Sequence, residues 1–290
     1  AHLREVIADV SGAVSPAVAG RALMPTGADQ PNELARLAAR IERALPPRDR
    51  ECFGRARHEP LTAEDVCAAR RVALEQLFWE LTYWKIPQDY ERLTAGEPVH
   101  PGALDYARVD GAVVLDAGAG SGRVTLPLAR RARHVYALDP APPLLRLLEQ
   151  KLARDHVTHV ELLRGTFSRV PLPDDSVDAV VSCSAFGPLE VRGGETGLGE
   201  LQRVTRPGGR IIVVWPEDPA WLARHGFHYV ALRGHLTITF PTLEEALATA
   251  RRFYGRRVVR YLERTARPEL PFAILGVKEP RDVCWLTVRK

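Results

Sequence analysis

Long apolar runs are missing from this sequence, although 46% of its 290 residues are hydrophobic. No stretch reaches the roughly 18 consecutive apolar residues that a membrane-spanning helix requires, so we expect no such helix. The first 24 residues are apolar in places, but Arg4, Glu5 and Asp9 interrupt them where a signal peptide has an uncharged apolar core. We therefore expect a cytoplasmic protein.

Cysteine is scarce as well. Four cysteines stand far apart and form no Cys-x-x-Cys pair, namely Cys52, Cys67, Cys183 and Cys284. Their spacing excludes a typical zinc site and a small disulfide scaffold, and we expect no bound metal. A chain of this length can bury a substantial apolar core, so its stability needs neither a metal nor a disulfide.

An excess of one charge is also lacking, since the formal net charge is only +4. Residues 1–110 carry 14 basic and 17 acidic side chains, whereas residues 111–290 carry 26 basic and 19 acidic ones. The N-terminal part is therefore not a basic arm for nucleic acid, and the C-terminal part can attract an anionic ligand.

Apolar residues at helical spacing characterise the N-terminal part. They predict helices over residues 31–45, 62–84, 88–93 and 102–107. Thr62, with Asp65 three positions later, resembles a capping box at the start of the second helix. We interpret residues 1–110 as an N-terminal helical cap.

After residue 110, short β-branched runs alternate with helical segments, which is typical of βαβ units and a parallel sheet. The pattern therefore predicts a doubly wound α/β domain over residues 111–290, with a C-terminal elaboration from about residue 217. Candidate strands cover residues 112–116, 134–139, 160–164, 179–183, 210–215, 235–240 and 283–289, with helices at 123–131, 143–154, 194–204 and 243–254.

The first of these strands runs into the loop Asp116-Ala117-Gly118-Ala119-Gly120-Ser121-Gly122 and then into a helix. Glycine permits positive φ at such a turn and lets a ligand approach backbone amides at the helix N-terminus. In a doubly wound sheet this turn opens into the crevice where ligands bind. A dinucleotide fingerprint, G-x-G-x-x-G/A, would need a small residue where this chain has Arg123, so the spacing disfavours a nicotinamide cofactor.

The G-x-G-x-G spacing after an acidic residue resembles the first motif of class I S-adenosylmethionine-dependent methyltransferases. The resemblance implies that S-adenosylmethionine is the cofactor and that the loop passes beneath its methionine half. It also implies that Asp116 helps to hold the amino group of the cofactor. The loop residues that we assign to the cofactor are Asp116, Ala117, Gly118, Ala119, Gly120 and Gly122.

Three further segments resemble the same family. Asp139-Pro140 ends the second strand, where the family has an acidic residue that accepts hydrogen bonds from both ribose hydroxyls. Thr166-Phe167 falls in the adenine-binding loop, where many members carry an aspartate in place of the threonine; Phe167 either lies against the adenine ring or fills core. Residues 200–214 resemble the helix, Pro-Gly-Gly turn and fifth strand. The resemblance implies a Rossmann-like seven-stranded sheet whose last strand is antiparallel.

The end of the fourth strand faces the methyl-transfer centre in this family. Here it reads Ser182-Cys183-Ser184-Ala185-Phe186-Gly187-Pro188 and lacks the Asn/Asp-Pro-Pro-aromatic sequence of enzymes that methylate exocyclic amines of bases. Base N-methylation is therefore disfavoured. The Pro-Cys motif of cytosine C5 methylation is also missing, so we interpret Cys183 as a small residue that lines the cofactor rather than a nucleophile.

No general base can be assigned from the sequence. His225, His228 and Tyr229 follow the fifth strand, where a substrate wall is expected, and they are the candidates; a structural or exposed role is the alternative for each histidine. Tyr90 and His100 precede the first strand, where related enzymes place a helix over the cofactor, and they are candidate cofactor contacts.

Arginines recur every four residues toward the C-terminus, at Arg252, Arg256, Arg260 and Arg264. They form either a basic stripe for an anionic substrate or nucleic acid, or a solvated helix face. Gly255 argues against one unbroken helix.

These features together predict an S-adenosylmethionine-dependent methyltransferase that acts on a small-molecule acceptor. An RNA or protein methyltransferase is the alternative that the basic C-terminal part leaves open, although nucleic acid is not the favoured partner. A catalytically inactive cofactor-binding regulatory protein is an alternative of another class, and a nicotinamide oxidoreductase comes third. The sequence identifies neither the acceptor nor the oligomeric state.

Overall fold

The computed structural model describes residues 16–25 and 31–290. Arg4, Glu5 and Asp9, which argue against a signal peptide, lie outside the described residues. The chain divides into two compact units, Ala1–Pro87 and Gln88–Lys290. Residues 88–110, which the sequence pattern groups with the N-terminal helices, belong to the second unit. That residues 1–110 act together as a helical cap stays a prediction.

The first unit consists of helices in its described part. Two of the predicted helices are confirmed, and the side chain of Thr62 caps the longer one by accepting a hydrogen bond from the Asp65 amide at 3.2 Å. One further helix starts at Pro47, where the sequence pattern indicates only a helix end. Proline fits the first position of a helix because its φ is already helical and its missing N–H has no partner there. The helices are α2 (Pro16–Ala22), α3 (Pro31–Ala44), α4 (Pro47–Arg57) and α5 (Ala63–Lys85).

The second unit is built on a seven-stranded sheet with the order β3-β2-β1-β4-β5-β9-β6. Strands β1 to β5 pair in parallel, whereas β9 is antiparallel to both of its neighbours. This arrangement confirms the predicted doubly wound sheet with an antiparallel last strand. The strands are β1 (Val113–Ala117), β2 (His134–Asp139), β3 (Val160–Arg164), β4 (Val177–Cys183), β5 (Thr205–Val214), β6 (His228–Ala231) and β9 (Asp282–Thr287).

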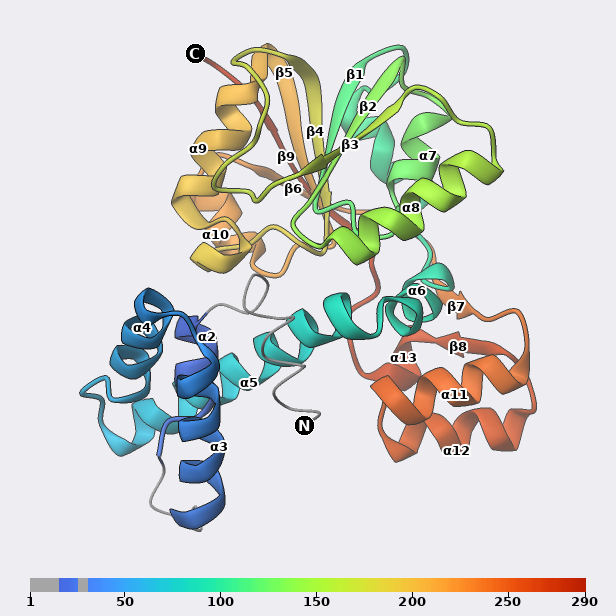
Figure 1. Ribbon diagram of the computed structural model, residues 1–290. Helices are drawn as coiled ribbons and strands as arrows, with labels where there is room; N and C mark the ends of the chain where they lie inside the picture. The colour runs from blue at the N-terminus through green and yellow to red at the C-terminus, as the bar shows by residue number, and fades with distance from the viewer. Residues whose placement is uncertain (1–15, 26–30) are drawn as a thin grey trace. The chain divides into compact units, whose positions relative to one another are not determined.

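Both faces of this sheet are covered by helices (Figure 1). Successive strand residues point to opposite faces, so Leu115 packs in the core beneath α9 and α10 while Val114 packs in the core beneath η1 and the start of α7. These short elements hold the strand ends, and therefore the loops that follow them, in fixed positions. They are α6 (Pro87–Ala95), η1 (Pro101–Ala107), α7 (Thr125–Ala129), α8 (Pro142–Arg154), η2 (Glu190–Arg192), α9 (Gly194–Val204) and α10 (Pro219–Arg224).

The C-terminal elaboration lies between β6 and β9 in the chain and has its own apolar core. The predicted strand over residues 235–240 is not the sixth strand of the sheet, because β7 pairs only with β8 in a separate ribbon. The sixth strand is β6, a largely exposed edge strand without an apolar pattern. The other elements are β7 (Thr237–Thr239), α11 (Leu243–Phe253), α12 (Arg256–Thr265), β8 (Glu269–Pro271) and α13 (Phe272–Leu275).

No helix among residues 16–25 and 31–290 combines the length and the apolar character needed to cross a membrane.

Candidate active site

The loop between β1 and α7 contains three glycines in the left-handed region, with φ of 84° at Gly118, 54° at Gly120 and 97° at Gly122. Two of them also lie too close to neighbouring atoms for a side chain. A Cβ on Gly118 would lie 2.6 Å from the Cβ of Ala185, and one on Gly122 would lie 2.5 Å from a methyl carbon of Leu148. The sequence therefore needs glycine here both for backbone conformation and for space.

The backbone amides of this loop tie it to the end of β2. The amides of Gly118 and Ala119 both donate to the carbonyl oxygen of Leu138 at 2.9 Å, and the amide of Gly120 donates to the Asp139 carboxylate at 2.9 Å. The expectation that the loop presents its amides to a ligand is therefore not met at these three positions. The loop instead offers a closely approachable backbone that its own hydrogen bonds keep rigid.

Asp116 lies at the start of the loop and is almost fully buried. One of its carboxylate oxygens accepts a hydrogen bond from the Thr125 hydroxyl at 2.5 Å. Burial raises the pKa of Asp116 to about 7, against the opposing effect of the Thr125 hydrogen bond, and the nearby charge of Asp139 adds to the rise. The charge of the largely buried Arg123 favours the anionic form, and a buried anion of this kind is suited to hold a positively charged ligand group.

Asp139, at the end of β2, is the second buried carboxylate of the loop. Its two oxygens accept hydrogen bonds from the amides of Gly120 at 2.9 Å and Ala141 at 2.8 Å. Burial raises the pKa of Asp139 to about 6 even though these backbone donors favour the charged form. Because a carboxylate has about four lone-pair sites, capacity is left to accept from ligand hydroxyls. Pro140 follows it and is exposed.

Because the charge of Asp116 is buried, we expect its removal to stabilise the folded protein by an amount that depends on pH. Its folded-state pKa lies above the ordinary value of 3.8, so its contribution to stability is fully present below about pH 4 and is lost as the pH rises through about 7. Asparagine keeps an oxygen for Thr125 without the charge. We expect Asp116→Asn to raise the free energy of unfolding at pH 8 by up to about 4 kcal/mol, and by little at pH 4.

Urea unfolding at the two pH values, without ligand, measures this difference. Asp155→Asn is the control, because Arg154 lowers the pKa of this exposed carboxyl and the sign of its pH dependence should be opposite. If Asp116→Asn instead lowered the free energy of unfolding by the same amount at both pH values, burial of the Asp116 charge would not be destabilising the folded protein.

Several of the predicted residues line one narrow cavity beside the loop. Asp116, Gly118 and Ala119 come from the loop, Cys183 from the end of β4 and Tyr90 from α6. A Cβ on Gly120 would lie 3.5 Å from the Tyr90 ring. The structure therefore brings together residues up to 93 positions apart in the sequence. Residues that line the same cavity without having been predicted are Thr94, Ser121, Arg123 and Val124. Of the other predicted loop residues, Ala117 is the buried last residue of β1.

Arg123 and Glu97 form a buried ion pair at this cavity. Arg123 also donates to the Sγ of Cys183 at 3.2 Å, and its guanidinium lies 5.9 Å from the centre of the Trp215 ring. Burial raises the pKa of Glu97, while the charge of Arg123 opposes that rise. The sequence could have indicated that Arg123 lies beside the cavity, because Arg123 directly follows the glycine loop. Nothing in the sequence connects it with Glu97.

Burial raises the pKa of the Cys183 thiol, although Arg123 acts in the opposite direction. The thiol is therefore neutral at physiological pH, and a neutral thiol is a poor nucleophile. This agrees with the interpretation of Cys183 as a residue that lines the cavity.

The two residues of the predicted adenine loop are placed differently. Phe167 reaches the glycine loop, since a Cβ on Gly118 would lie 3.3 Å from its ring, and its ring centre is 5.3 Å from that of Phe186. Thr166 is exposed, and its hydroxyl is 3.1 Å from the hydroxyl of Ser168. Phe167 therefore both fills core and borders the loop.

Two of the three candidates for a base lie away from the loop. His228 and Tyr229 belong to the edge strand β6, which β4, β5 and β9 separate from β1, a distance of roughly 19 Å at ordinary strand spacing. The His228 ring packs against that of Trp285 at an interplanar angle of 33°, and the hydroxyl of Tyr229 accepts a hydrogen bond from Lys278. Both ring nitrogens of His225 have partners, the Trp221 carbonyl and the Glu195 carboxylate. A catalytic role for these residues stays a prediction.

His100 has a structural role that the sequence does not indicate. Its Nδ1 accepts a hydrogen bond from the Gly102 amide at the start of η1, and its Nε2 donates to the carbonyl of Arg233 at 3.0 Å. Both ring nitrogens are therefore used within the protein, between η1 and the chain after β6.

Comparison with known proteins gives three findings. Residues 115–213 match the family described as a methyltransferase domain. An uncharacterized methyltransferase of Mycobacterium tuberculosis is 36% identical over 168 residues, which are 56% of this chain and 64% of that protein. A demethylmenaquinone methyltransferase of Clavibacter sepedonicus is 37% identical over 122 residues, which are 42% of this chain and 48% of that protein. The chain thus spans less than two thirds of the length of these curated relatives.

Among solved structures, a SAM dependent methyltransferase from Aquifex aeolicus is similar at 22% identity and a TM-score of 0.40, with 50% of this chain and 89% of that chain covered. A TM-score this low carries no weight, so the fold assignment rests on the strand order described above.

Proposed function

We propose that this protein transfers a methyl group from S-adenosylmethionine to a small-molecule acceptor, because residues 115–213, which include the glycine loop, match a methyltransferase domain. The observation that carries the proposal is the pair of buried carboxylates, Asp116 and Asp139, on the two sides of a rigid glycine loop. A cofactor with an ammonium group and two ribose hydroxyls has the chemistry that such a pair requires.

The residues at the loop would divide the binding of this cofactor between them. Asp116 would accept hydrogen bonds from the ammonium group, and Asp139 from the ribose hydroxyls. Gly118 makes room for the close packing of Ala185 and Phe167 on the loop, and Phe167 offers an aromatic face beside it. When bound, S-adenosylmethionine supplies an electrophilic methyl group on a sulfonium.

Catalysis then depends on alignment of the acceptor atom with that methyl group, and on removal of a proton when the acceptor is a hydroxyl or a carbon acid. Cys183 and Arg123, at the end of β4 and after the loop, border the cavity where this alignment would take place. A small-molecule acceptor is supported by the demethylmenaquinone methyltransferase among the relatives.

Calorimetric titration tests the cofactor. We expect S-adenosylmethionine and S-adenosylhomocysteine to bind with one site per chain, and NADH not to bind. Binding of NADH alone would replace the proposal with an oxidoreductase. If the cofactor binds, a screen for transfer of a labelled methyl group to metabolite and RNA pools separates an active small-molecule enzyme from an RNA methyltransferase and from a regulatory protein without activity.

A further inference from the structure

Helix α12 presents two faces of opposite character. Val258 and Leu262 are buried in the core of the C-terminal elaboration. The exposed side carries four arginines, namely Arg256, Arg257, Arg260 and Arg264. The single acidic residue of the helix, Glu263, lies 3.5 Å from Arg251 of α11.

The charges of these four arginines are not neutralised within the protein. None of them forms an ion pair with any residue that the structure describes. Arg256, Arg260 and Arg264 follow each other at intervals of four, which brings like charges together on one helix face. Arg256 and Arg257 also occupy the first turn, where the helix dipole disfavours a cation. The helix thus carries a repulsion that a bound anion would remove.

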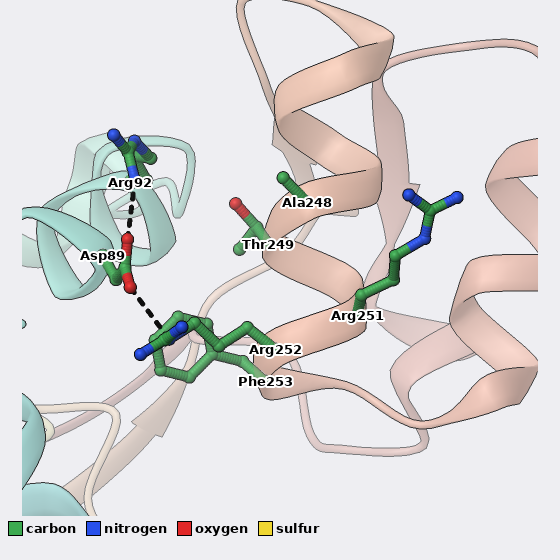
Figure 2. A pocket seen from close by; sticks show the side chains of 7 residues that line it. All are labelled: Asp89, Arg92, Ala248, Thr249, Arg251, Arg252 and Phe253. Atoms are coloured by element: carbon green, nitrogen blue, oxygen red, sulfur yellow. Dashed lines mark hydrogen bonds and ion pairs between the residues drawn. The ribbon is translucent and has the colours of Figure 1, made fainter.

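In a neighbouring arginine cluster, between α6 and α11, the arginines have an acidic partner. Figure 2 shows Asp89 between Arg92 and Arg252, with distances of 2.6 Å and 2.8 Å to the two guanidinium groups. Arg251 points away from this group. Because Asp89 satisfies both of its arginines, this cluster holds α6 against α11 and has little need of an external anion.

A depression between α11 and α12 contains two of the four unpaired arginines. It has a volume of about 530 Å³ and is lined by Arg251, Tyr254, Arg256, Val259 and Arg260, which we call the arginine pocket. The volume lies within the range of small-molecule sites. Of its three arginines, Arg251 pairs with Glu263, so the charges of Arg256 and Arg260 are left. Val259 and Tyr254 add apolar surface for the organic part of a ligand.

The apolar core beside the arginine pocket reaches the candidate active site through Trp215. Tyr254 lines the pocket, while its hydroxyl is buried and has no hydrogen-bond partner among the described residues. Trp215 packs against the same apolar core as Tyr254, and the guanidinium of Arg123 lies 5.9 Å from the centre of the Trp215 ring. Glu97 in turn pairs with Arg123 at the cavity of the glycine loop. The core that carries the arginine pocket therefore borders the Arg123–Glu97 ion pair through Trp215.

We propose that the arginine pocket binds a phosphate or diphosphate group of the methyl acceptor, with Arg256 and Arg260 as the principal contacts. Guanidinium groups match phosphoryl oxygens in bidentate geometry. The inference rests on the proposed function only in naming the ligand as the acceptor, since anion binding itself requires no methyl transfer.

Titration with inorganic pyrophosphate at low ionic strength tests the site. The variant Arg256→Gln/Arg260→Gln removes two residues that line the pocket. The matched control, Arg257→Gln/Arg264→Gln, removes the same charge from the same helix outside the pocket. We expect the first variant to bind pyrophosphate at least about tenfold more weakly than the native protein, and the control to bind within about twofold of it.

Three outcomes would overturn the proposal. The first is that the native protein does not bind pyrophosphate, and the second is that both variants lose affinity equally, which would mean a diffuse attraction of charge. The third is a preference for RNA, with an affinity that increases with chain length and falls steeply with salt, which would make the site a nucleic-acid surface. Titration of the same samples with S-adenosylmethionine shows separately whether the proposed function fails, because both variants should bind it like the native protein.

Discussion

Alanine in place of Asp139 is expected to weaken the binding of S-adenosylmethionine by about 100-fold or more, because two hydrogen bonds from ribose hydroxyls to a charged group are lost. The same change removes the acceptor for the amides of Gly120 and Ala141. The loop would then lose part of its rigid geometry as well. Calorimetric titration measures the affinity.

Asp139→Asn separates these two effects. Its amide oxygen can still accept from one backbone amide, but its NH₂ group cannot accept from a hydroxyl. We expect an intermediate loss of affinity with thermal unfolding close to that of the native protein. An unchanged affinity in both variants would mean that the ribose is not held at Asp139.

Alanine in place of Gly118 should abolish measurable cofactor binding and destabilise the fold. The residue has φ of 84°, and the added Cβ would lie 2.6 Å from the Cβ of Ala185. The backbone conformation alone costs on the order of 1 kcal/mol, and the contact adds to it because Ala185 has no flexible side chain that can move away. We expect a loss of about 3 kcal/mol in the free energy of unfolding by urea.

Gly111→Ala is the matched control, because this glycine has φ of 68° and no atom within 4 Å of an added Cβ. It should show the backbone cost and retain cofactor binding. The double variant Gly118→Ala/Ala185→Gly should recover most of the stability that the contact removes. If the two single glycine variants behave alike, close approach at Gly118 has no special importance.

The sheet could be predicted where the strands are buried. The bounds of β2 and β3 agree with the sequence pattern, because strands inside a parallel sheet are short apolar runs between turn residues. Strand β6 was missed because an edge strand that is largely exposed has no such run. Helix α4 was missed because Pro47, which starts it, also reads as the end of the helix before.

Residues of the candidate site that belong to one short motif could be predicted from the sequence, whereas residues that meet only in the folded chain could not. Gly118 and Asp116 belong to one short motif with a backbone requirement of its own, and Cys183 follows from its place at a strand end. Glu97 and Arg123 are 26 positions apart, and only the folded chain makes them a pair. His100 looked like a ligand residue in the sequence, whereas its hydrogen bonds give it a role in capping.

The two buried carboxylates of the glycine loop also have a consequence for the lifetime of the protein in a cell. Without a ligand, their burial lowers the stability of the folded chain at neutral pH, and a ligand that binds only the folded state restores about 2.7 kcal/mol at 100 times its dissociation constant. Quality-control proteases degrade chains that unfold often. The abundance of such an enzyme would then follow the supply of methyl donor, so that little of it persists when there is nothing to transfer.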